Sequence, residues 1–339
     1  EPSPERVSPP CPYFGSTGCG GCQWQHIDYQ AQLRFKTEIV IDQLSRIGKI
    51  EAPPVQPALP TPSAWAYRNH AQFHPTPEGQ LGFLSADDNT PMPISECLVL
   101  HPLLADLYAT LDLETEGLKR LSLRAAISSG ERMLVFEMED DLPPALEIDL
   151  PVSCVMQLSD GLHANLIGHN HITETVAGHA YRISAPSFFQ VNTAQAARLV
   201  ELVLDYLDLG EDESILDVYC GVGLFTLPIA ERTGLVTCIE LAPSAIDDLM
   251  FNTTPFENVD IIEGAAKDIL PQLDQSFDAA IVDPPRAGLD RFALDALVER
   301  HPARLVYVSC DPATLARDAK RLTAAGYRLL KVQPVDMFP

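Results

Sequence analysis

From residue 193 onward, the sequence alternates between helix-like and strand-like segments. Stretches in which apolar residues recur near the 3.6-residue helical period are separated by short apolar runs that are typical of buried strands. The pattern predicts strands at 214–218, 235–240, 259–263, 279–283 and 305–309, and helices at 193–207, 224–231, 243–252, 293–300 and 315–325. Such alternation indicates a parallel sheet with helices on both faces. We therefore predict a doubly wound α/β domain over 186–339.

The first half of the chain has a different organisation. Residues 1–24 contain three cysteines and several glycines, and 25–50 should form a helix, capped by Asp28, that packs on the catalytic domain. A proline-rich stretch follows at 52–62. Short strands are expected after it at 65–70, 82–84, 125–127, 133–137, 152–158 and 181–183. These segments predict a β-rich central domain over 51–185.

Composition bounds the class of protein. No apolar run approaches the roughly 18 residues of a membrane span, so we expect neither a membrane segment nor a signal peptide. Eight cysteines, unevenly placed, are too few for a secreted disulfide scaffold. The chain does not begin with methionine and is interpreted as a fragment of a cytoplasmic protein.

The net charge of −24 argues against a nucleic-acid partner, because phosphate binding is driven by lysine and arginine. Locally the balance reverses, since seven basic and two acidic residues lie between positions 300 and 331. This segment is either a solvated helix face or an electrostatic footprint for RNA. The basic residues are Arg300, Arg304, Arg317, Lys320, Arg321, Arg328 and Lys331.

The N-terminal cysteines suggest a metal centre. Cys11, Cys19 and Cys22 form a C-x7-C-x2-C run with glycines that let the backbone fold tightly, and Cys97 is the best candidate for a fourth ligand. Four thiolates suit a [4Fe–4S] cluster or structural zinc equally on spacing alone. A disulfide is the alternative, which the cytoplasmic interpretation disfavours.

The first strand of the α/β domain leads into a candidate cofactor loop, Asp217-Val-Tyr-Cys-Gly-Val-Gly223. Its glycines would let the backbone approach a ligand. A dinucleotide site calls for a third glycine where Thr226 stands. Glu240, at the end of the next strand, can bind both ribose hydroxyls, whereas the acid in the first loop would repel a pyrophosphate. A nucleoside without phosphates fits better, which points to S-adenosylmethionine.

Two later strands end next to residues that could take part in a reaction. Cys310 follows the strand at 305–309, so it is either a nucleophile at the ligand-binding edge of the sheet or a small core residue. Asp283 begins Asp-Pro-Pro-Arg-Ala-Gly, a stiff loop that would hold a carboxylate beside the methyl donor. That loop could also be a plain turn, or the site of an amino-methyltransferase, which would not use the cysteine.

Five motifs in order resemble the RNA uracil-5-methyltransferase family. They are Ser-Phe-Phe-Gln-Val-Asn at 187–192, the cofactor loop at 217–223, Asp-Pro-Pro-Arg-Ala-Gly at 283–288, Ser-Cys-Asp-Pro-Ala-Thr-Leu-Ala-Arg-Asp at 309–318 and Asp-Met-Phe-Pro at 336–339. The N-terminal cysteines, Tyr-Arg-Asn at 67–69 and Glu-Cys-Leu at 96–98 resemble the iron–sulfur branch of that family.

The resemblance implies a Rossmann-like S-adenosylmethionine methyltransferase domain, a β-rich central domain and an N-terminal iron–sulfur loop. It implies methylation of carbon 5 of an RNA uridine, with Cys310 adding to carbon 6 and Asp283 holding the uracil edge. The expected cofactor-binding residues are Gln190, Asp217, Tyr219, Gly221, Gly223, Glu240 and Asp283. Phe188, Gln190 and Arg68 are expected to contact the substrate, and Cys11, Cys19, Cys22 and Cys97 to hold a [4Fe–4S] cluster rather than zinc.

The expected substrate is a flipped or single-stranded uridine, in 23S ribosomal RNA before transfer RNA, and the enzyme is expected to be a monomer without a membrane partner. By resemblance, the base that removes the carbon-5 proton follows Asp-Met-Phe-Pro, so it is expected beyond Pro339, and a small N-terminal RNA-binding domain is expected before Glu1. Ala265 replaces an acid expected to contact adenine. These departures keep open a noncatalytic RNA- or protein-binding relative.

Overall fold

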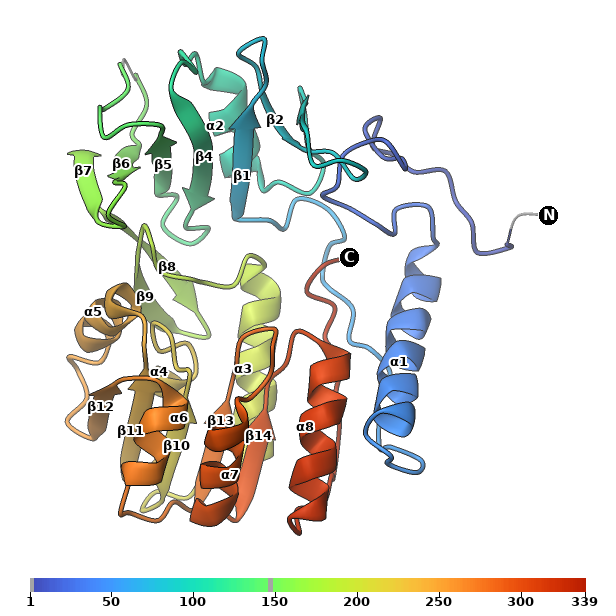
Figure 1. Ribbon diagram of the computed structural model, residues 1–339, viewed down its shortest axis with the longest axis vertical. Coiled ribbons are helices and arrows are strands. Elements are labelled where there is room, and N and C mark those ends of the chain that lie inside the picture. Colours follow the sequence, from blue (N-terminus) through green and yellow to red (C-terminus); the bar gives the residue numbers. More distant parts are fainter. Residues whose placement is uncertain (1–2, 146–148) are drawn as a thin grey trace.

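The computed structural model describes residues 3–145 and 149–339, and the chain forms an upper β-rich part and a lower α/β part (Figure 1). The α/β part contains β10 (Ser214–Val218), β11 (Leu235–Glu240), β12 (Val259–Glu263), β13 (Ala279–Val282) and β14 (Arg304–Tyr307). All neighbours pair in parallel, in the order β12-β11-β10-β13-β14. This confirms the predicted doubly wound fold, whose strand order reverses between β10 and β13.

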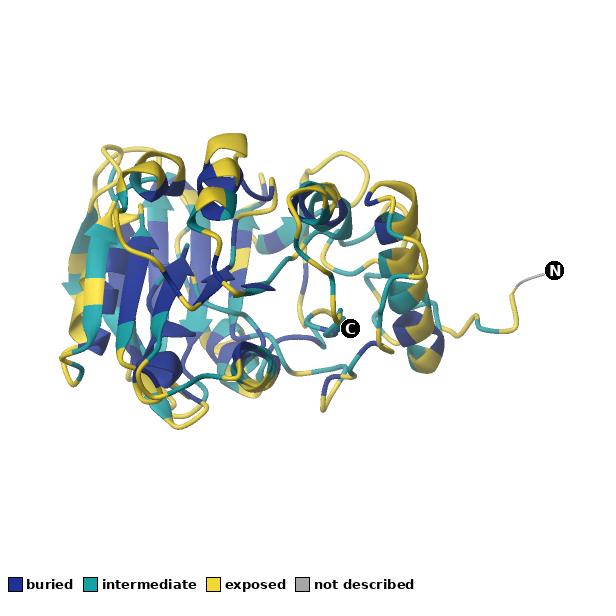
Figure 2. Cartoon of the chain, turned by 90° about the horizontal axis from the view of Figure 1, so that it is seen from below, coloured by how far each residue is buried: buried dark blue, intermediate teal, exposed yellow. Residues whose placement is uncertain are grey.

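Helices cover both faces of this sheet. They are α3 (Thr193–Leu207), α4 (Thr226–Ala230), α5 (Pro243–Asn252), α6 (Ala266–Ile269), α7 (Arg291–Arg300) and α8 (Pro312–Ala324), with a short 3₁₀ turn at Leu270–Gln272. Along β10, Ile215 packs into a core with α3 and α4, whereas the next residue, Leu216, packs into a second core with α7. Figure 2 shows buried strands between helices whose outer faces are exposed. The alternation of strand side chains thus fills two cores from one sheet.

Polar side chains cap several helices, and Asp28 is the cap expected from the sequence. Asp28 accepts hydrogen bonds from Gln30 and Ala31 at the start of α1 (Tyr29–Arg46). Asp311 caps α8 in the same way. The cap of α3 is Asn192 rather than Thr193, because the Asn192 carboxamide oxygen accepts from the Gln195 amide and Thr193 is already helical.

The central part is a seven-stranded sheet in the order β3-β2-β1-β4-β5-β6-β7. Its pairs are antiparallel except for β5 and β6. The sheet and the unpredicted helix α2 (Pro102–Thr110) enclose an aromatic core in which Phe73 stacks on Phe83 and Tyr108. The strands are β1 (His70–Pro75), β2 (Leu81–Leu84), β3 (Pro91–Pro93), β4 (Leu118–Ala125), β5 (Arg132–Met138), β6 (Ser153–Gln157) and β7 (His163–Ile167). The predicted strand at 65–70 is wrong, since β1 begins where it was expected to end.

A hairpin of β8 (His171–Val176) and β9 (His179–Ser184) forms its own two-stranded sheet. Its buried residues share a core with α3, α4 and β10, and the Tyr181 hydroxyl donates to the carbonyl of Leu224 at 3.0 Å. We propose that the domain boundary lies before β8, so that the hairpin belongs to the α/β domain and not to a central domain ending at 185.

Helix α1 lies beside α8, far from it in sequence (Figure 1). Leu44 of α1 packs against Ala316 and Ala319 of α8. At the other end of α1, Tyr29 and Lys36 bind the buried carboxylate of Asp336. In the described residues no helix has the length and apolar character needed to cross a membrane.

Candidate functional site

Four of the five parallel strands end in predicted site residues. Tyr219 follows β10, Glu240 ends β11, Asp283 follows β13 and Cys310 lies three residues beyond β14. Because parallel strands share one carboxyl edge, these residues gather there, beside the β10–β13 switch point where ligands bind such sheets. The Asp283 amide donates to the carbonyl of Val218 at 3.2 Å, which joins the ends of β13 and β10.

The loop after β10 is shaped for close approach by a ligand. Tyr219, Gly221 and Gly223 all have positive φ (64°, 57° and 95°). A Cβ at Gly223 would meet Leu249 at 2.7 Å, so packing also requires glycine there. At Gly221 a Cβ would meet nothing within 4 Å, which leaves that face of the loop open. The loop thus presents bare backbone to the switch point.

Glu240 organises the neighbouring backbone. One carboxylate oxygen accepts from the Gly221 amide at 2.9 Å, and the other accepts from Leu241 and Ala242 at 2.7 and 2.8 Å. The side chain is partly exposed. A carboxylate fixed in this way is pre-positioned to accept hydrogen bonds from a ribose.

Asp217 lies behind the loop and is 1% exposed, so it does not present its carboxyl to a ligand as direct cofactor binding would require. Thr226 donates to one oxygen of Asp217 at 2.7 Å, and the other oxygen has no hydrogen-bond partner within the described parts of the chain. Burial raises the pKa of Asp217 to about 7, and the nearby Asp283 and Glu240 carboxylates add to the rise. Thr226, the residue in place of the third glycine, therefore stabilises the loop from within.

Burial also raises the pKa of Asp283, to about 6. The residue as a whole is partly exposed, unlike Asp217, and Pro284 and Pro285 follow it directly. The edge of the sheet therefore holds two carboxyl groups, those of Asp217 and Asp283, that ionise near neutral pH. Such groups are typical of ligand-binding clefts.

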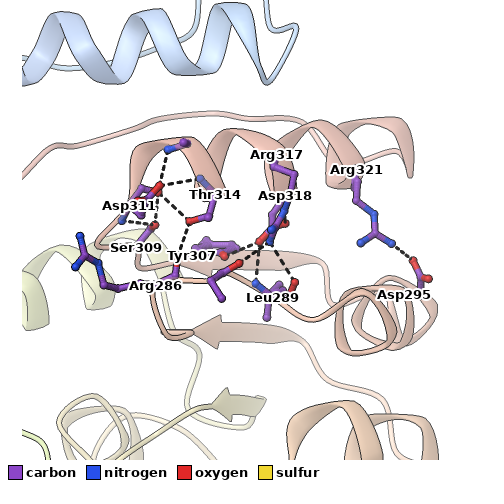
Figure 3. A network of polar contacts seen from close by, with 12 residues as sticks. Arg286, Leu289, Asp295, Tyr307, Ser309, Asp311, Thr314, Arg317, Asp318 and Arg321 are labelled. Carbon is purple, nitrogen blue, oxygen red and sulfur yellow. Dashed lines mark hydrogen bonds and ion pairs between the residues drawn. The ribbon is translucent and has the colours of Figure 1, made fainter.

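Cys310 is the only exposed cysteine in the described parts of the chain. It lies in a stiff turn where the Ser309 hydroxyl bonds to the backbone of Asp311, and Asp311 caps α8 (Figure 3). Thr314 of α8 donates to the carbonyl of Arg286 at 3.2 Å, which ties this turn to the loop that begins at Asp283. The core alternative for Cys310 is wrong, because its side chain is at the surface.

Four of the basic residues in the predicted footprint at 300–331 bind groups of their own chain. Arg317 binds Asp318, and Arg321 binds Asp295 (Figure 3). Arg304 pairs with Glu213, and Arg300 donates to carbonyls of the 3₁₀ turn. The segment is therefore less free to bind phosphate than its charge suggests.

The loop between β9 and α3 carries Phe188 and Gln190. Phe188 is 71% exposed, whereas Gln190 is partly buried. Sequence reasoning missed the neighbour that holds this loop, Asn69, whose carboxamide donates to the carbonyl of Gln190 at 3.1 Å. The sequence signal for Asn69 was its position directly after Arg68 in the Tyr-Arg-Asn motif at 67–69.

One cavity of about 460 Å³ brings all four candidate cysteine ligands together. Arg68 and Phe188 line the same cavity, so the cysteine region adjoins the loop of Gln190. Burial raises the pKa of the Cys97 thiol to about 11. In the described residues no three His, Cys, Asp or Glu side chains are already at metal-binding spacing. The thiols thus share one cavity without forming a closed metal site.

The chain is similar to known proteins over its whole length. The family model described as tRNA (uracil-5-)-methyltransferase matches residues 165–276 and 267–339. Uncharacterized RNA methyltransferases of Halalkalibacterium halodurans and Thermosynechococcus vestitus are 35% and 33% identical; each match covers all of this chain, and 82% and 83% of the relative.

A solved structure shows the same likeness. The tRNA (uracil-54, C5)-methyltransferase of Pyrococcus abyssi, in complex with S-adenosyl-L-homocysteine, superimposes with a TM-score of 0.79 and 28% identity, covering 100% of this chain and 84% of that one. The chain is therefore an RNA methyltransferase that uses S-adenosylmethionine, and it belongs to the tRNA (uracil-5-)-methyltransferase family.

Proposed function

We propose that this enzyme methylates carbon 5 of a uridine in RNA through a covalent adduct with Cys310. The observation that carries the proposal is the placement of an exposed thiol at the carboxyl edge of the sheet, in a turn tied to the Asp283 loop. The test is incubation of RNA with methyl-labelled S-adenosylmethionine, followed by digestion to nucleosides. Label in 5-methyluridine is expected, and label in a methylated amine would contradict the proposal.

The chemistry requires an activated ring, because carbon 5 of uracil is weakly nucleophilic. The Cys310 thiolate adds to carbon 6, and the resulting enolate attacks the methyl group of the sulfonium from carbon 5. The bond between that methyl group and sulfur breaks, and S-adenosylhomocysteine leaves with the electron pair. A base then takes the proton from carbon 5, and the electrons of that bond expel the thiolate. Asp283 and Gln190 hold the uracil edge in this proposal. The family resemblance places the base after Asp336-Met-Phe-Pro, so no residue of this chain is assigned to it.

For the methyl donor, we assign Tyr219, Gly221, Gly223 and Glu240 to direct contact. The open backbone at Gly221 supports this role, as does the fixed Glu240 carboxylate. Asp217 is assigned to support of the loop, because it is buried.

The pKa values of Asp283 and Asp217 predict how cofactor binding depends on pH. Both carboxyls are neutral below about pH 5 and ionise as pH rises through about 6 and 7, so the cationic sulfonium should bind more tightly at about pH 8 than at pH 5. The gain in affinity between these two pH values should approach about tenfold for each unit by which the bound cation lowers the pKa of a carboxyl. S-adenosylhomocysteine has a neutral sulfur, so its affinity should rise less with pH. Calorimetric titration of both ligands checks this, and equal gains would refute it.

For the substrate, we propose 23S ribosomal RNA first, since the cysteine region resembles the iron–sulfur branch. Transfer RNA is the second candidate, favoured by the likeness to a tRNA (uracil-54, C5)-methyltransferase. Methylation of purified ribosomal and transfer RNA from a strain lacking the gene separates the two. In either case the uridine must leave its stack to reach the thiol.

We propose that Cys11, Cys19, Cys22 and Cys97 hold a [4Fe–4S] cluster that shapes the RNA-binding surface. Their shared cavity supports this assignment, and so does the chemistry of the donor set, because thiolates are the ligands of such clusters. The cluster would contribute fixed local structure, and no step of the reaction is assigned to it.

Anaerobically purified protein should therefore be brown, with about four iron atoms per chain. Cys97→Ser should lose most of the iron, because one of four ligands is removed. Cys154→Ser is the matched control, since Cys154 is buried in the central core and does not line this cavity, so its loss should leave the iron content unchanged. A colourless protein that binds zinc would refute the cluster.

A further inference from the structure

The loop that carries Phe188 and Gln190 has no regular structure of its own between β9 and α3. The contacts that hold the loop must therefore determine where these two side chains lie. Contacts from the central domain hold both ends of the loop, at the matched ends of β1 and β4, where His70 pairs with Arg124. The Ser187 hydroxyl of the loop also donates to Asp248 of α5 at 2.6 Å.

Asn69 holds the end of the loop near α3. It is 7% exposed, and its Nδ2 donates to the Gln190 carbonyl at 3.1 Å and to Thr193 Oγ1 at 2.9 Å. A carbonyl oxygen only accepts, so the Asn69 amide nitrogen must face Gln190. The backbone of Asn69 also donates to the Val191 carbonyl at 2.9 Å. Three hydrogen bonds from one residue thus span Gln190 to Thr193.

The contact with Thr193 continues into a buried carboxylate. The Thr193 hydroxyl accepts from Asn69 and donates to Glu174 at 3.3 Å. Glu174 is 1% exposed and also accepts from the amides of Ile127 and Ser128, which follow β4. Because an ionised carboxylate only accepts, the Thr193 hydroxyl must donate to Glu174 and accept from Asn69, so the direction of these hydrogen bonds is fixed.

Arg124 holds the other end of the loop. Its Nη1 donates to the carbonyls of Ser187 and Ser184 at 2.8 and 3.2 Å. Burial lowers the pKa of Arg124 to about 10. The guanidinium is thus held in a poorly solvated place, where it donates to backbone carbonyls at the end of β9 and at the start of the loop.

We propose that Asn69 and Arg124 are positioning residues that clamp the two ends of the loop between β9 and α3, so that contacts from the central domain help to set where Gln190 and Phe188 lie in the uridine site. The inference rests on the proposed uridine methylation only for the roles of Gln190 and Phe188. The clamp itself rests on the hydrogen bonds.

The test compares Asn69→Ala and Asn69→Asp with Asn258→Ala in the full-length protein. Asn258 is a matched control, because its amide also bridges two carbonyls, of Ala230 and Thr233, at 2.9 and 2.8 Å, away from the loop. Both Asn69 variants should lower kcat by about tenfold to a hundredfold, the scale of a small misplacement of binding groups. Asn69→Asp keeps the packing but loses the donors, so an effect in both variants assigns the loss to the hydrogen bonds. Asn258→Ala should lower the thermal midpoint with kcat unchanged.

Hydrogen–deuterium exchange gives a readout that does not depend on activity. In the wild type, peptides covering 184–195 should exchange as slowly as the flanking elements, and Asn69→Asp should speed exchange there without changing α7. Arg124→Lys should speed exchange at the Ser187 end. Fast exchange in the wild type, or Asn69 variants with unchanged exchange and wild-type kcat, would overturn the clamp. If the wild-type enzyme methylated no uridine, the proposed function would be wrong. The exchange experiment would still test the clamp, because it does not depend on activity.

Discussion

Cys310→Ser is expected to lower methyl transfer to RNA by on the order of 10⁴-fold or more, the scale seen when a covalent nucleophile is removed. The serine hydroxyl has nearly the shape of the thiol but stays protonated near neutral pH, so carbon 6 is not attacked. Because Cys310 is exposed and makes no core contact, the variant should fold and bind S-adenosylhomocysteine like the wild type. Initial rates of methyl incorporation measure the loss.

RNA containing 5-fluorouridine tests the same step directly. Fluorine at carbon 5 cannot leave as a proton does, so wild-type enzyme should remain covalently attached to the methylated RNA, visible as a slow band on a denaturing gel. Cys310→Ser should give no such band. Cys154→Ser, at a buried cysteine of the central domain, should still give it. If Cys310→Ser kept full activity, the site would be that of an amino-methyltransferase using Asp283 and its prolines.

The catalytic half of the fold was predictable because its signals are local. Each strand of the α/β domain is a short apolar run, and each ends in a residue whose chemistry differs from the run before it. Parallel pairing then brings these ends to one edge without further information. For this reason Glu240, Asp283 and Cys310 lie at or just beyond strand ends, where sequence order predicts them.

Other features could not be predicted, because they depend on contacts between distant segments. Asp217 has the same local context as a cofactor ligand, yet its side chain turns inward to Thr226. Asn69 contacts Gln190 across 121 positions of sequence. The hairpin of β8 and β9 is β-like in sequence and yet packs with the helices of the other domain.

The net charge of the chain is a poor guide to its partner for the same reason, because binding depends on which charges are free locally. A net charge of −24 argues against a nucleic-acid partner, whereas the family is one of RNA methyltransferases. The local excess of arginines does not resolve this, because Arg304, Arg317 and Arg321 are paired with carboxylates of their own chain. Arg68, which lines the cysteine cavity together with Phe188, makes no ion pair among the described residues, and we propose it as an RNA contact.

Asp283→Ala is expected to lower kcat by about 10²- to 10³-fold, the usual cost of removing one group that stabilises charge in a transition state. Asp283 lies at the carboxyl edge beside the end of β10, and Pro284 and Pro285 stiffen the backbone that carries it. Without its carboxyl, the uracil edge and the enolate formed by attack of Cys310 lose a fixed partner. Formation of the 5-fluorouridine adduct should therefore slow in parallel with turnover.

Asp278 provides the control at the opposite end of the same strand, where its carboxylate accepts from the Ser214 amide at 2.9 Å. Asp278→Ala removes an equal charge and a comparable hydrogen bond, and it should leave kcat within about twofold of wild type, since exposed sites away from the reaction have small effects. Asp283→Asn should fall between Asp283→Ala and wild type, because the amide keeps the shape and an acceptor oxygen but loses the charge that strengthens the hydrogen bond. Equal losses in Asp278→Ala and Asp283→Ala would show that the strand needs both carboxylates for stability, and would remove Asp283 from the reaction.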